Sequence, residues 1–237
     1  MDTNTLYVAD LVLKRGGKPV LHGVSLNIQA GAVTALLGAN GAGKSSLVLA
    51  IAGAIELSSG DIKHKNQPLS GLRPEQIRKR GVAIVPEGHQ VLSELSVLDN
   101  LRAAGSACST RKLQSEIARV LDIFPELNAK LNTRGGDLSG GQKQMVSISQ
   151  ALIAAPQFLL IDELSLGLAP AVVKRLAEVV RQIAESGVGV LLIEQFTNIA
   201  LGLAQHAYVM EHGRIVFSGS SQQLRDDPSI LHSAYLA

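Results

Sequence analysis

An octapeptide near the start of the chain reads Gly38-Ala39-Asn40-Gly41-Ala42-Gly43-Lys44-Ser45. It matches the pattern G-x-x-x-x-G-K-[ST] at every fixed position. An apolar run, Val33 to Leu37, precedes it, and an apolar segment with helical character, Ser46 to Ala52, follows it. This order of strand, glycine loop and helix predicts a loop whose backbone N–H groups and helix dipole bind a polyphosphate. An ordinary glycine-rich turn is the alternative interpretation.

Two polar side chains of this loop carry specific expectations. Lys44 is expected to reach the terminal phosphates of the ligand, and Ser45 is expected to bind Mg²⁺. Ser46, the next residue, is assigned to the same site because it opens the helix whose N-terminus faces the phosphates.

Length and composition limit the classes of protein that the chain can be. Its 237 residues, 46% of them hydrophobic, suffice for one large domain or one domain with an inserted subdomain. With 22 Lys and Arg against 20 Asp and Glu, the net charge is only +2, which gives no support for nucleic-acid binding. The single cysteine, Cys108, excludes an intrachain disulfide. There is no signal-peptide pattern and no apolar run near the length of a membrane span, so we expect a soluble or peripheral protein, in the cytoplasm.

The apolar pattern predicts strands that alternate with helices. Strands are expected at residues 6–12, 24–28, 33–37, 82–85, 158–161 and 188–193, with another near Ile62. Helices are expected at 46–52, from Arg73 onward, at 142–154 and at 170–186, with a hairpin over 207–217 and a short helical tail. Residues 88–153 read as a mostly helical insertion. The alternation predicts a mostly parallel sheet with helices on both faces.

A second apolar run ends in two carboxylates, Phe158-Leu159-Leu160-Ile161-Asp162-Glu163. A buried strand of this kind brings its acids out at its carboxyl end, which lies beside the phosphate loop in a parallel sheet. Asp162 is therefore expected to hold Mg²⁺, and Glu163 to accept a proton from the attacking water. A solvated strand end is the alternative for an Asp-Glu pair taken alone.

A third motif, Leu138-Ser139-Gly140-Gly141-Gln142, places a hydroxyl and glycine N–H groups at the start of a predicted helix. This arrangement suits a second phosphate site, although the same pentapeptide taken alone is also a possible helix cap. Together with the glycine loop and Asp162-Glu163, the motif resembles the signature of the ATP-binding cassette (ABC) family. The resemblance covers the whole chain.

The resemblance implies an α/β fold with a RecA-like P-loop NTPase core, an N-terminal antiparallel β subdomain and an inserted α-helical subdomain. The chain is then one ABC ATPase domain, with its core at 1–87 and 154–237 and its helical subdomain at 88–153. ATP and Mg²⁺ are the implied cofactors. In the family, Ser139, Gly140, Gly141 and Gln142 would contact the γ-phosphate of an ATP held by the other subunit, so two chains close head to tail.

The chain also resembles the LivF-type ATPases of branched-chain amino-acid importers. The matching segments are Leu21-His22-Gly23-Val24-Ser25, Val85-Pro86-Glu87-Gly88, Leu164 to Pro170, Ile193-Glu194-Gln195, and the tail from Asp227-Pro228 to Ala234-Tyr235-Leu236. This implies a peripheral protein at the cytoplasmic face of the inner membrane. Its partners would be transmembrane permease subunits, a second ABC ATPase subunit and, indirectly, a periplasmic or extracellular solute-binding protein. We expect the permease contact around Gly88 to Asn100, with a plain surface loop and helix as the alternative.

Several positions depart from the general cassette pattern, and three of these departures bear on the ATP site. Glu87 replaces a glutamine that senses Mg²⁺, and a carboxylate there ligates the metal but repels phosphate. Gln195 replaces a histidine at the γ-phosphate, and an amide donates a hydrogen bond without titrating. The aromatic that stacks on adenine is absent, which leaves Lys14 or Arg15 to stack or simply to face solvent. We hypothesise an asymmetric pair, in which this chain gives a complete signature to its partner while its own ATP site, including Lys44, Glu163 and Gln195, turns over more slowly.

Two other functions remain open from the sequence. One is a soluble cassette ATPase that acts on DNA or ribosomes, although such proteins usually have coiled-coil insertions or tandem cassettes. The other is a regulatory cassette that binds ATP without hydrolysis, against which the intact Lys44, Asp162 and Glu163 argue. The transported solute and the choice between heterodimer and homodimer also stay open, with Glu87 and Gln195 favouring a heterodimer.

Overall fold

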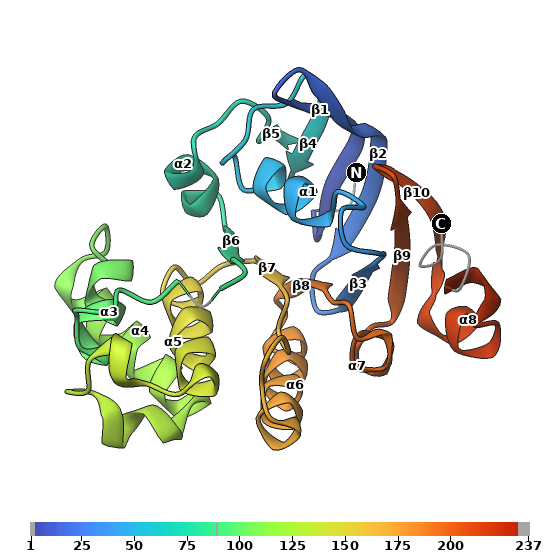
Figure 1. Cartoon of the computed structure of the whole chain (residues 1–237). Helices are drawn as coiled ribbons and strands as arrows, with labels where there is room; N and C mark the ends of the chain where they lie inside the picture. Colours follow the sequence, from blue (N-terminus) through green and yellow to red (C-terminus); the bar gives the residue numbers. More distant parts are fainter. Residues whose placement is uncertain (1–2, 89, 232–237) are drawn as a thin grey trace.

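The computed structural model describes residues 3–88 and 90–231 and contains two β-sheets surrounded by helices (Figure 1). The smaller sheet is antiparallel, with the strand order β2-β1-β4-β5. It contains β1 (Thr5–Arg15), β2 (Lys18–Gln29), β4 (Ser59–His64) and β5 (Gln67–Pro68). Side chains of β2 alternate between core and solvent, with Val24, Leu26 and Ile28 buried, as a sheet with one covered face requires.

The larger sheet has the strand order β10-β9-β3-β8-β7-β6. Its strands are β3 (Val33–Leu37), β6 (Val82–Val85), β7 (Phe158–Asp162), β8 (Gly189–Ile193), β9 (His206–Glu211) and β10 (Arg214–Ser220). Neighbouring strands from β6 to β9 run parallel, and only β10 is antiparallel to its neighbour. Every residue of β3, β7 and β8 is buried, as expected for parallel strands covered on both faces.

The helices cover both faces of this sheet and form a separate group beside it. They are α1 (Lys44–Ile51), α2 (Pro74–Lys79), α3 (Val97–Ala104), α4 (Thr110–Ile123), α5 (Gly140–Leu152), α6 (Pro170–Glu185), α7 (Thr197–Leu203) and α8 (Ser221–Asp226), with 3₁₀ turns η1 (Pro125–Lys130) and η2 (Gly135–Asp137). Within the described part of the chain, none of the helices has the length and apolar character needed to cross a bilayer.

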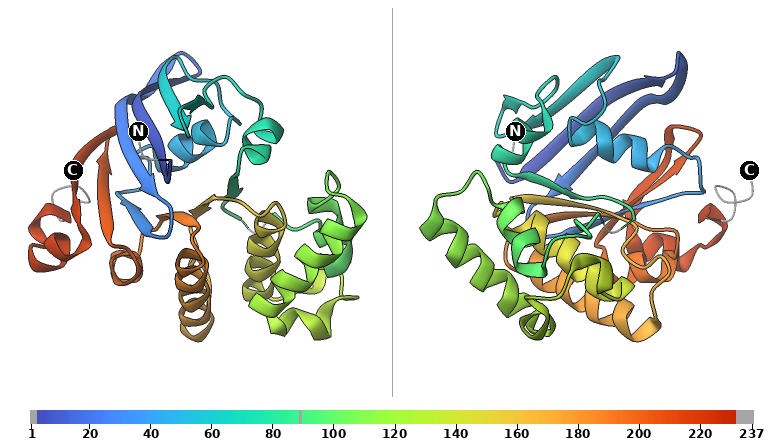
Figure 2. Two further views of the ribbon diagram at one scale, coloured as in Figure 1. Left: turned by 180° about the vertical axis from the view of Figure 1, so that it is seen from behind. Right: turned by 60° about the vertical axis from the view of Figure 1, so that its left-hand side comes forward.

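Alternate residues of the central strands face two different hydrophobic clusters. Leu36 and Leu160 pack in a cluster with α1 and the antiparallel sheet, whereas Ala35 and Leu159 pack in a cluster with α5, α6 and α7. Figure 2 shows α5 and α6, coloured yellow to orange, on the opposite side of the sheet from α1. The period-two alternation of the strands thus fixes a three-layer arrangement around β3, β7 and β8.

The structure confirms the predicted fold class and corrects several element boundaries. α1 begins at Lys44 rather than Ser46, and the signature helix α5 spans Gly140–Leu152 rather than 142–154. β2 begins at Lys18, because its first residues pair with the end of β1 instead of forming a loop. α7 was not predicted. The end of the expected tail motif, residues 232–237, lies outside the described residues.

Candidate nucleotide-binding site

The glycine loop joins the end of β3 to the start of α1 and depends on three positive φ angles. Gly38, Gly41 and Gly43 have φ of 148°, 82° and 106°, which L side chains rarely adopt. At Gly38 space is also lacking, because a Cβ atom would lie 2.2 Å from the carbonyl oxygen of Met210. β9 therefore packs directly under the loop, and glycine is required at position 38 for both conformation and space.

The turn between β9 and β10 supports the loop from outside. The N–H of Gly213 donates to the carbonyl of Ala42 at 2.9 Å, and the carbonyl of Gly213 accepts from the N–H of His22 at 2.9 Å. Asn40 and Gly41 lie exposed at the tip of the loop, whereas Ala42 is buried. The hairpin thus ties the loop to β2 in the antiparallel sheet and leaves its tip open for a ligand.

Lys44 is the first residue of α1, and its ammonium group turns back into the loop. Its Nζ donates to the carbonyl oxygens of Gly38 at 2.7 Å and Ala39 at 2.9 Å, and the residue is 6% exposed. Burial lowers the pKa of the ammonium group, and the charges of Glu163 and Asp162 act in the opposite direction. The two carbonyls satisfy this cation in a position from which phosphate oxygens can replace them.

Asp162 ends β7 and stands beside Ile193 in the parallel ladder with β8. It is 4% exposed, and this burial raises the pKa of its carboxyl group, while a hydrogen bond from Ser45 lowers it and the charges of Glu163 and Glu87 raise it. Oδ1 of Asp162 is buried without a hydrogen-bond partner. A buried carboxylate oxygen beside a serine hydroxyl fits a divalent cation. Among residues 3–88 and 90–231, no three His, Cys, Asp or Glu side chains form a metal-binding group by themselves.

Glu163 leaves the strand in an unusual conformation. Its φ is 59°, which costs a non-glycine residue about 1–2 kcal/mol, and its N–H is held by the carbonyl of Ile193 at 3.0 Å. Oε1 accepts a hydrogen bond from Nε2 of Gln195 at 2.6 Å, while Oε2 is buried without a partner. One carboxylate oxygen is thus fixed, and the other remains available as a base.

A second carboxylate, Glu194, lies between Ile193 and Gln195 and is 1% exposed. Ser165 donates to both of its oxygens, with the backbone N–H at 3.0 Å from Oε1 and the hydroxyl at 2.8 Å from Oε2. Burial raises the pKa of this carboxyl group, whereas the hydrogen bonds from Ser165 and Leu164 lower it. The segment after β7 is therefore joined side by side to the segment after β8.

The signature motif forms the start of α5. Ser139 is the N-cap residue: its hydroxyl oxygen accepts from the N–H of Gln142 at 3.3 Å, and the Gln142 side chain accepts from the N–H of Ser139 at 3.1 Å. A Cβ at Gly141 would lie 2.6 Å from Val172, so this glycine allows α5 and α6 to approach closely. Ser139 and Gly140 are exposed, which leaves the helix N-terminus open to an anion.

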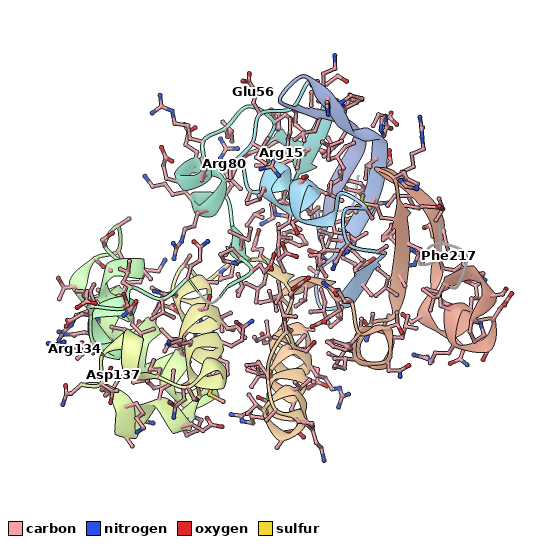
Figure 3. All side chains as sticks on the ribbon, in the orientation of Figure 1. Arg15, Glu56, Arg80, Arg134, Asp137 and Phe217 are labelled. Atoms are coloured by element: carbon pink, nitrogen blue, oxygen red, sulfur yellow. The ribbon has the colours of Figure 1, made fainter. Side chains whose placement is uncertain are left out.

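The structure brings some predicted site residues together and separates others. Lys44, Ser45, Asp162 and Glu163, with Gln195, meet at the carboxyl ends of β3, β7 and β8, and the charge of the exposed Glu87 acts on Asp162. The signature motif is distant: Figure 3 shows Asp137, just before it, on the helical side of the molecule. Arg15 lies exposed opposite Lys18 at the end of β1, on the side of the antiparallel sheet (Figure 3).

Sequence reasoning missed two contacts of this site. It placed Gln195 near the γ-phosphate but did not foresee its bond to Glu163, and it gave no role to Glu194. A signal was present, because a charged residue directly follows the apolar strand β8. The contact partner of Glu194 could not be inferred without the register of β7 and β8. This register pairs Asp162 with Ile193 and so brings the residues that follow the two strands together.

A parallel sheet with a glycine loop after β3, a buried Asp-Glu pair after β7 and a serine-capped glycine helix start defines a nucleotide-binding cassette ATPase. The family described as "ABC transporter" matches residues 21–165, more than half of the sequence. The chain therefore belongs to the ABC transporter family, as its motifs predict, and it is an ATP-binding subunit with ATPase activity.

Relatives and solved structures agree with this assignment. The chain is 41% identical over 216 residues to the high-affinity branched-chain amino acid transport ATP-binding protein BraG of Pseudomonas aeruginosa, covering 91% of this chain and 92% of that protein. It is 31% identical over 206 residues to the probable branched-chain amino acid transport ATP-binding protein LivF of Archaeoglobus fulgidus, covering 86% and 87%. A nucleotide-free ATP-binding cassette from an ABC transporter superposes with a TM-score of 0.86 at 26% identity, covering 95% and 96%. The ADP conformation of MJ1267, an ATP-binding cassette of an ABC transporter, also gives a TM-score of 0.86, at 27% identity and covering 96% of both chains.

Proposed function

We propose that this chain is the energy-coupling subunit of an importer for branched-chain amino acids, bound at the cytoplasmic face of the inner membrane. The observation that carries its catalytic part is the meeting of Lys44, Asp162 and the Glu163–Gln195 pair at one edge of the parallel sheet. The 41% identity to BraG over 91% of the chain supports the solute class.

The phosphates of ATP bind to the N–H groups of the loop from Gly38 to Ser45 and to Lys44, which releases its two carbonyl partners. Ser45 and Asp162, whose Oδ1 has no hydrogen-bond partner, are the residues that would hold Mg²⁺. When bound, Mg²⁺ neutralises negative charge on the phosphate oxygens. Glu87 serves the same site from its exposed position after β6.

Glu163 accepts a proton from the water that attacks the γ-phosphate, with its unpartnered Oε2 as the receiving atom. Gln195 fixes the other oxygen by its bond of 2.6 Å. Because Gln195 is an amide, this contact does not depend on a titrating imidazole. The proposed asymmetry between the two ATP sites rests on slower turnover with Gln195 than with a histidine in its place.

Ser139 and the N–H groups of Gly140 and Gly141 serve an ATP held by a second cassette. The motif lies away from the chain's own glycine loop, so it would serve a partner, and the exposure of Ser139 and Gly140 leaves the start of α5 open to one. A sister ATPase is the partner that we favour, with a second copy of this chain as the alternative. Arg15 stacks on the adenine of the chain's own ATP.

A groove of about 680 Å³ fits the permease contact. It lies between the core and the helical group, and its walls include Leu49, Ala52, Ile84, Pro86, Gln90 and Leu92. Leu92, which lines the groove, is 51% exposed, and Leu95, three residues further along the chain, is 37% exposed. An apolar segment of a permease subunit would cover these residues. It would be displaced when the neighbouring Glu87 changes position.

Co-purification and transport test this function together. The tagged chain is isolated from gently solubilised membranes of its native cell, and the complex is reconstituted in liposomes with its solute-binding protein and internal ATP. We expect two permease subunits and a second cassette ATPase to co-purify, and ATP-dependent uptake of leucine. Isolation with ribosomes or DNA-repair proteins instead would overturn the importer assignment. Uptake of a different solute would overturn only the amino-acid part.

A further inference from the structure

Glu194 has no role in the mechanism above, yet it is among the most deeply buried charged groups described, at 1% exposure. A buried carboxylate is retained only when its oxygens are satisfied. Ser165 satisfies both, through its N–H at 3.0 Å and its hydroxyl at 2.8 Å. In the described part of the chain, no lysine or arginine forms an ion pair with Glu194. The carboxylate is therefore an acceptor for one neighbouring segment rather than half of a salt bridge.

The segment that Glu194 holds also contains Glu163, the proposed base. Ser165 follows Glu163 by two residues, and the intervening Leu164 is 0% exposed. The carbonyl of Ser165 also accepts from the N–H of Leu168 at 3.2 Å, which closes a turn before α6. Fixing Ser165 thus fixes the backbone on the carboxyl side of Glu163, just as the bond to Ile193 fixes it on the amino side.

Two sets of side-chain hydrogen bonds, which we call ties, join the segment after β7 to the segment after β8. Gln195 reaches Glu163 at 2.6 Å, and the adjacent Glu194 reaches Ser165. Together with the bond from the Glu163 N–H to the Ile193 carbonyl, these ties hold the segment after β7 at Glu163 and at Ser165. With both ties, Glu163 stays in its positive φ of 59°, a conformation that persists only where the surroundings determine it.

We propose that Glu194 is a positioning residue for ATP hydrolysis: by holding Ser165, it keeps the Glu163 carboxylate in the orientation that Gln195 and the attacking water require. This rests on the proposed role of Glu163 as the proton acceptor. Glu194 itself touches neither nucleotide nor water. Its loss should reduce the rate of the chemical step without reducing the affinity for ATP, because the glycine loop and Lys44 lie in other segments.

The test uses the assembled transporter with variants of this chain. Glu194→Leu keeps the approximate volume and removes both acceptors, whereas Glu194→Gln keeps one acceptor for the Ser165 N–H and an amide that can donate to the hydroxyl. We expect Glu194→Leu to lower kcat by about tenfold to a hundredfold. The affinity for ATP, titrated without Mg²⁺, should change less than twofold, and Glu194→Gln should restore most of kcat.

Ser165→Ala is the second variant, because it removes only the hydroxyl bond and keeps the hydrogen bond from the Ser165 N–H to Glu194. We expect a smaller loss of kcat from it, again with unchanged ATP affinity. In a Glu163→Gln background, neither substitution should lower the residual single-turnover rate further, because both act through Glu163. A purely structural role would instead lower the thermal midpoint and ATP binding in parallel.

The outcomes separate this inference from the proposed function. If Glu163→Gln retains hydrolysis at this chain's own ATP site, the base assignment fails whatever Glu194 does. If Glu163→Gln is inactive while Glu194→Leu and Ser165→Ala keep the kcat of the unmodified chain, only the role of Glu194 is overturned. Additive losses in the Glu163→Gln background would overturn it as well.

Discussion

Nε2 of Gln195 lies 2.6 Å from Oε1 of Glu163 and donates a hydrogen bond to it. The bond joins the first residue after β7 to a residue just beyond β8, and it leaves Oε2 of Glu163 without a partner. The amide donates this hydrogen bond without itself titrating, but it cannot carry positive charge to the γ-phosphate. The geometry therefore couples the orientation of the base to a residue that differs from the histidine of most cassettes.

Gln195→His should raise the ATPase rate of the assembled transporter several-fold. An imidazole can donate to Glu163 as the amide does and can in addition become cationic near the phosphate. Phosphate release from reconstituted complexes measures the rate, with Gln195→Asn, a shorter amide, as the control that should not gain activity. A lower rate for the histidine variant would count against the proposed asymmetry.

Glu163→Gln should reduce ATP hydrolysis at this chain's own site by about a hundredfold or more, since it removes a general base while keeping the size of the side chain. ATP binding should persist, because the residues that hold the phosphates are unchanged. Phosphate release measures hydrolysis, and an equilibrium titration measures the affinity for ATP. A variant with near-normal hydrolysis would show that another group accepts the proton.

Asp162→Asn should stabilise the nucleotide-free protein at neutral pH. Burial raises the pKa of the Asp162 carboxyl group above its unfolded value, so folding disfavours the ionised form. Burial of the ionised Asp162 therefore lowers the free energy of unfolding. This loss is absent below the unfolded pKa of about 3.9 and grows as the pH rises through the folded pKa. Urea unfolding should thus show a higher midpoint for the variant at pH 7, and no difference at acidic pH. An equal gain at both pH values would contradict this origin.

Gly38→Ala should destabilise the fold by about 1–3 kcal/mol, because the added Cβ would collide with the Met210 carbonyl oxygen 2.2 Å away. Gly41→Ala is the matched control. It also adds a methyl group at positive φ, 82°, but nothing lies within 4 Å of the new atom. Its loss of stability in urea should be the smaller of the two. Equal losses would show that conformational strain rather than space decides at position 38.

Leu92→Glu should weaken co-purification of the permease, because it places a charge on the 51% exposed apolar residue at the edge of the groove. Val216→Glu is the control, since Val216 is 52% exposed on β10, far from the groove in sequence and in the sheet. Both variants should keep their thermal midpoints. Retained permease with Leu92→Glu would place the contact elsewhere.

Most of the fold was accessible from local patterns. The buried strands β3, β6 and β7 read as short continuous apolar runs, and the helix expected from Arg73 onward is α2, which begins at Pro74. The first half of β2 and α7 were missed for a common reason. Their residues lack a clear apolar period, and pairing with β1 or packing on the sheet decides their conformation.

The chemical groups of the site could be identified from local motifs: the glycine loop with Lys44 and Ser45, the Asp162-Glu163 pair and the serine-glycine start of α5. Each of these motifs acts through its own backbone conformation and its immediate neighbours, so a few consecutive residues are enough to identify it. The hydrogen bonds from Gln195 to Glu163 and from Ser165 to Glu194, in contrast, follow from the folding of the chain. Those contacts join residues 32 and 29 positions apart, and they exist because the parallel register of β7 and β8 sets Asp162 beside Ile193.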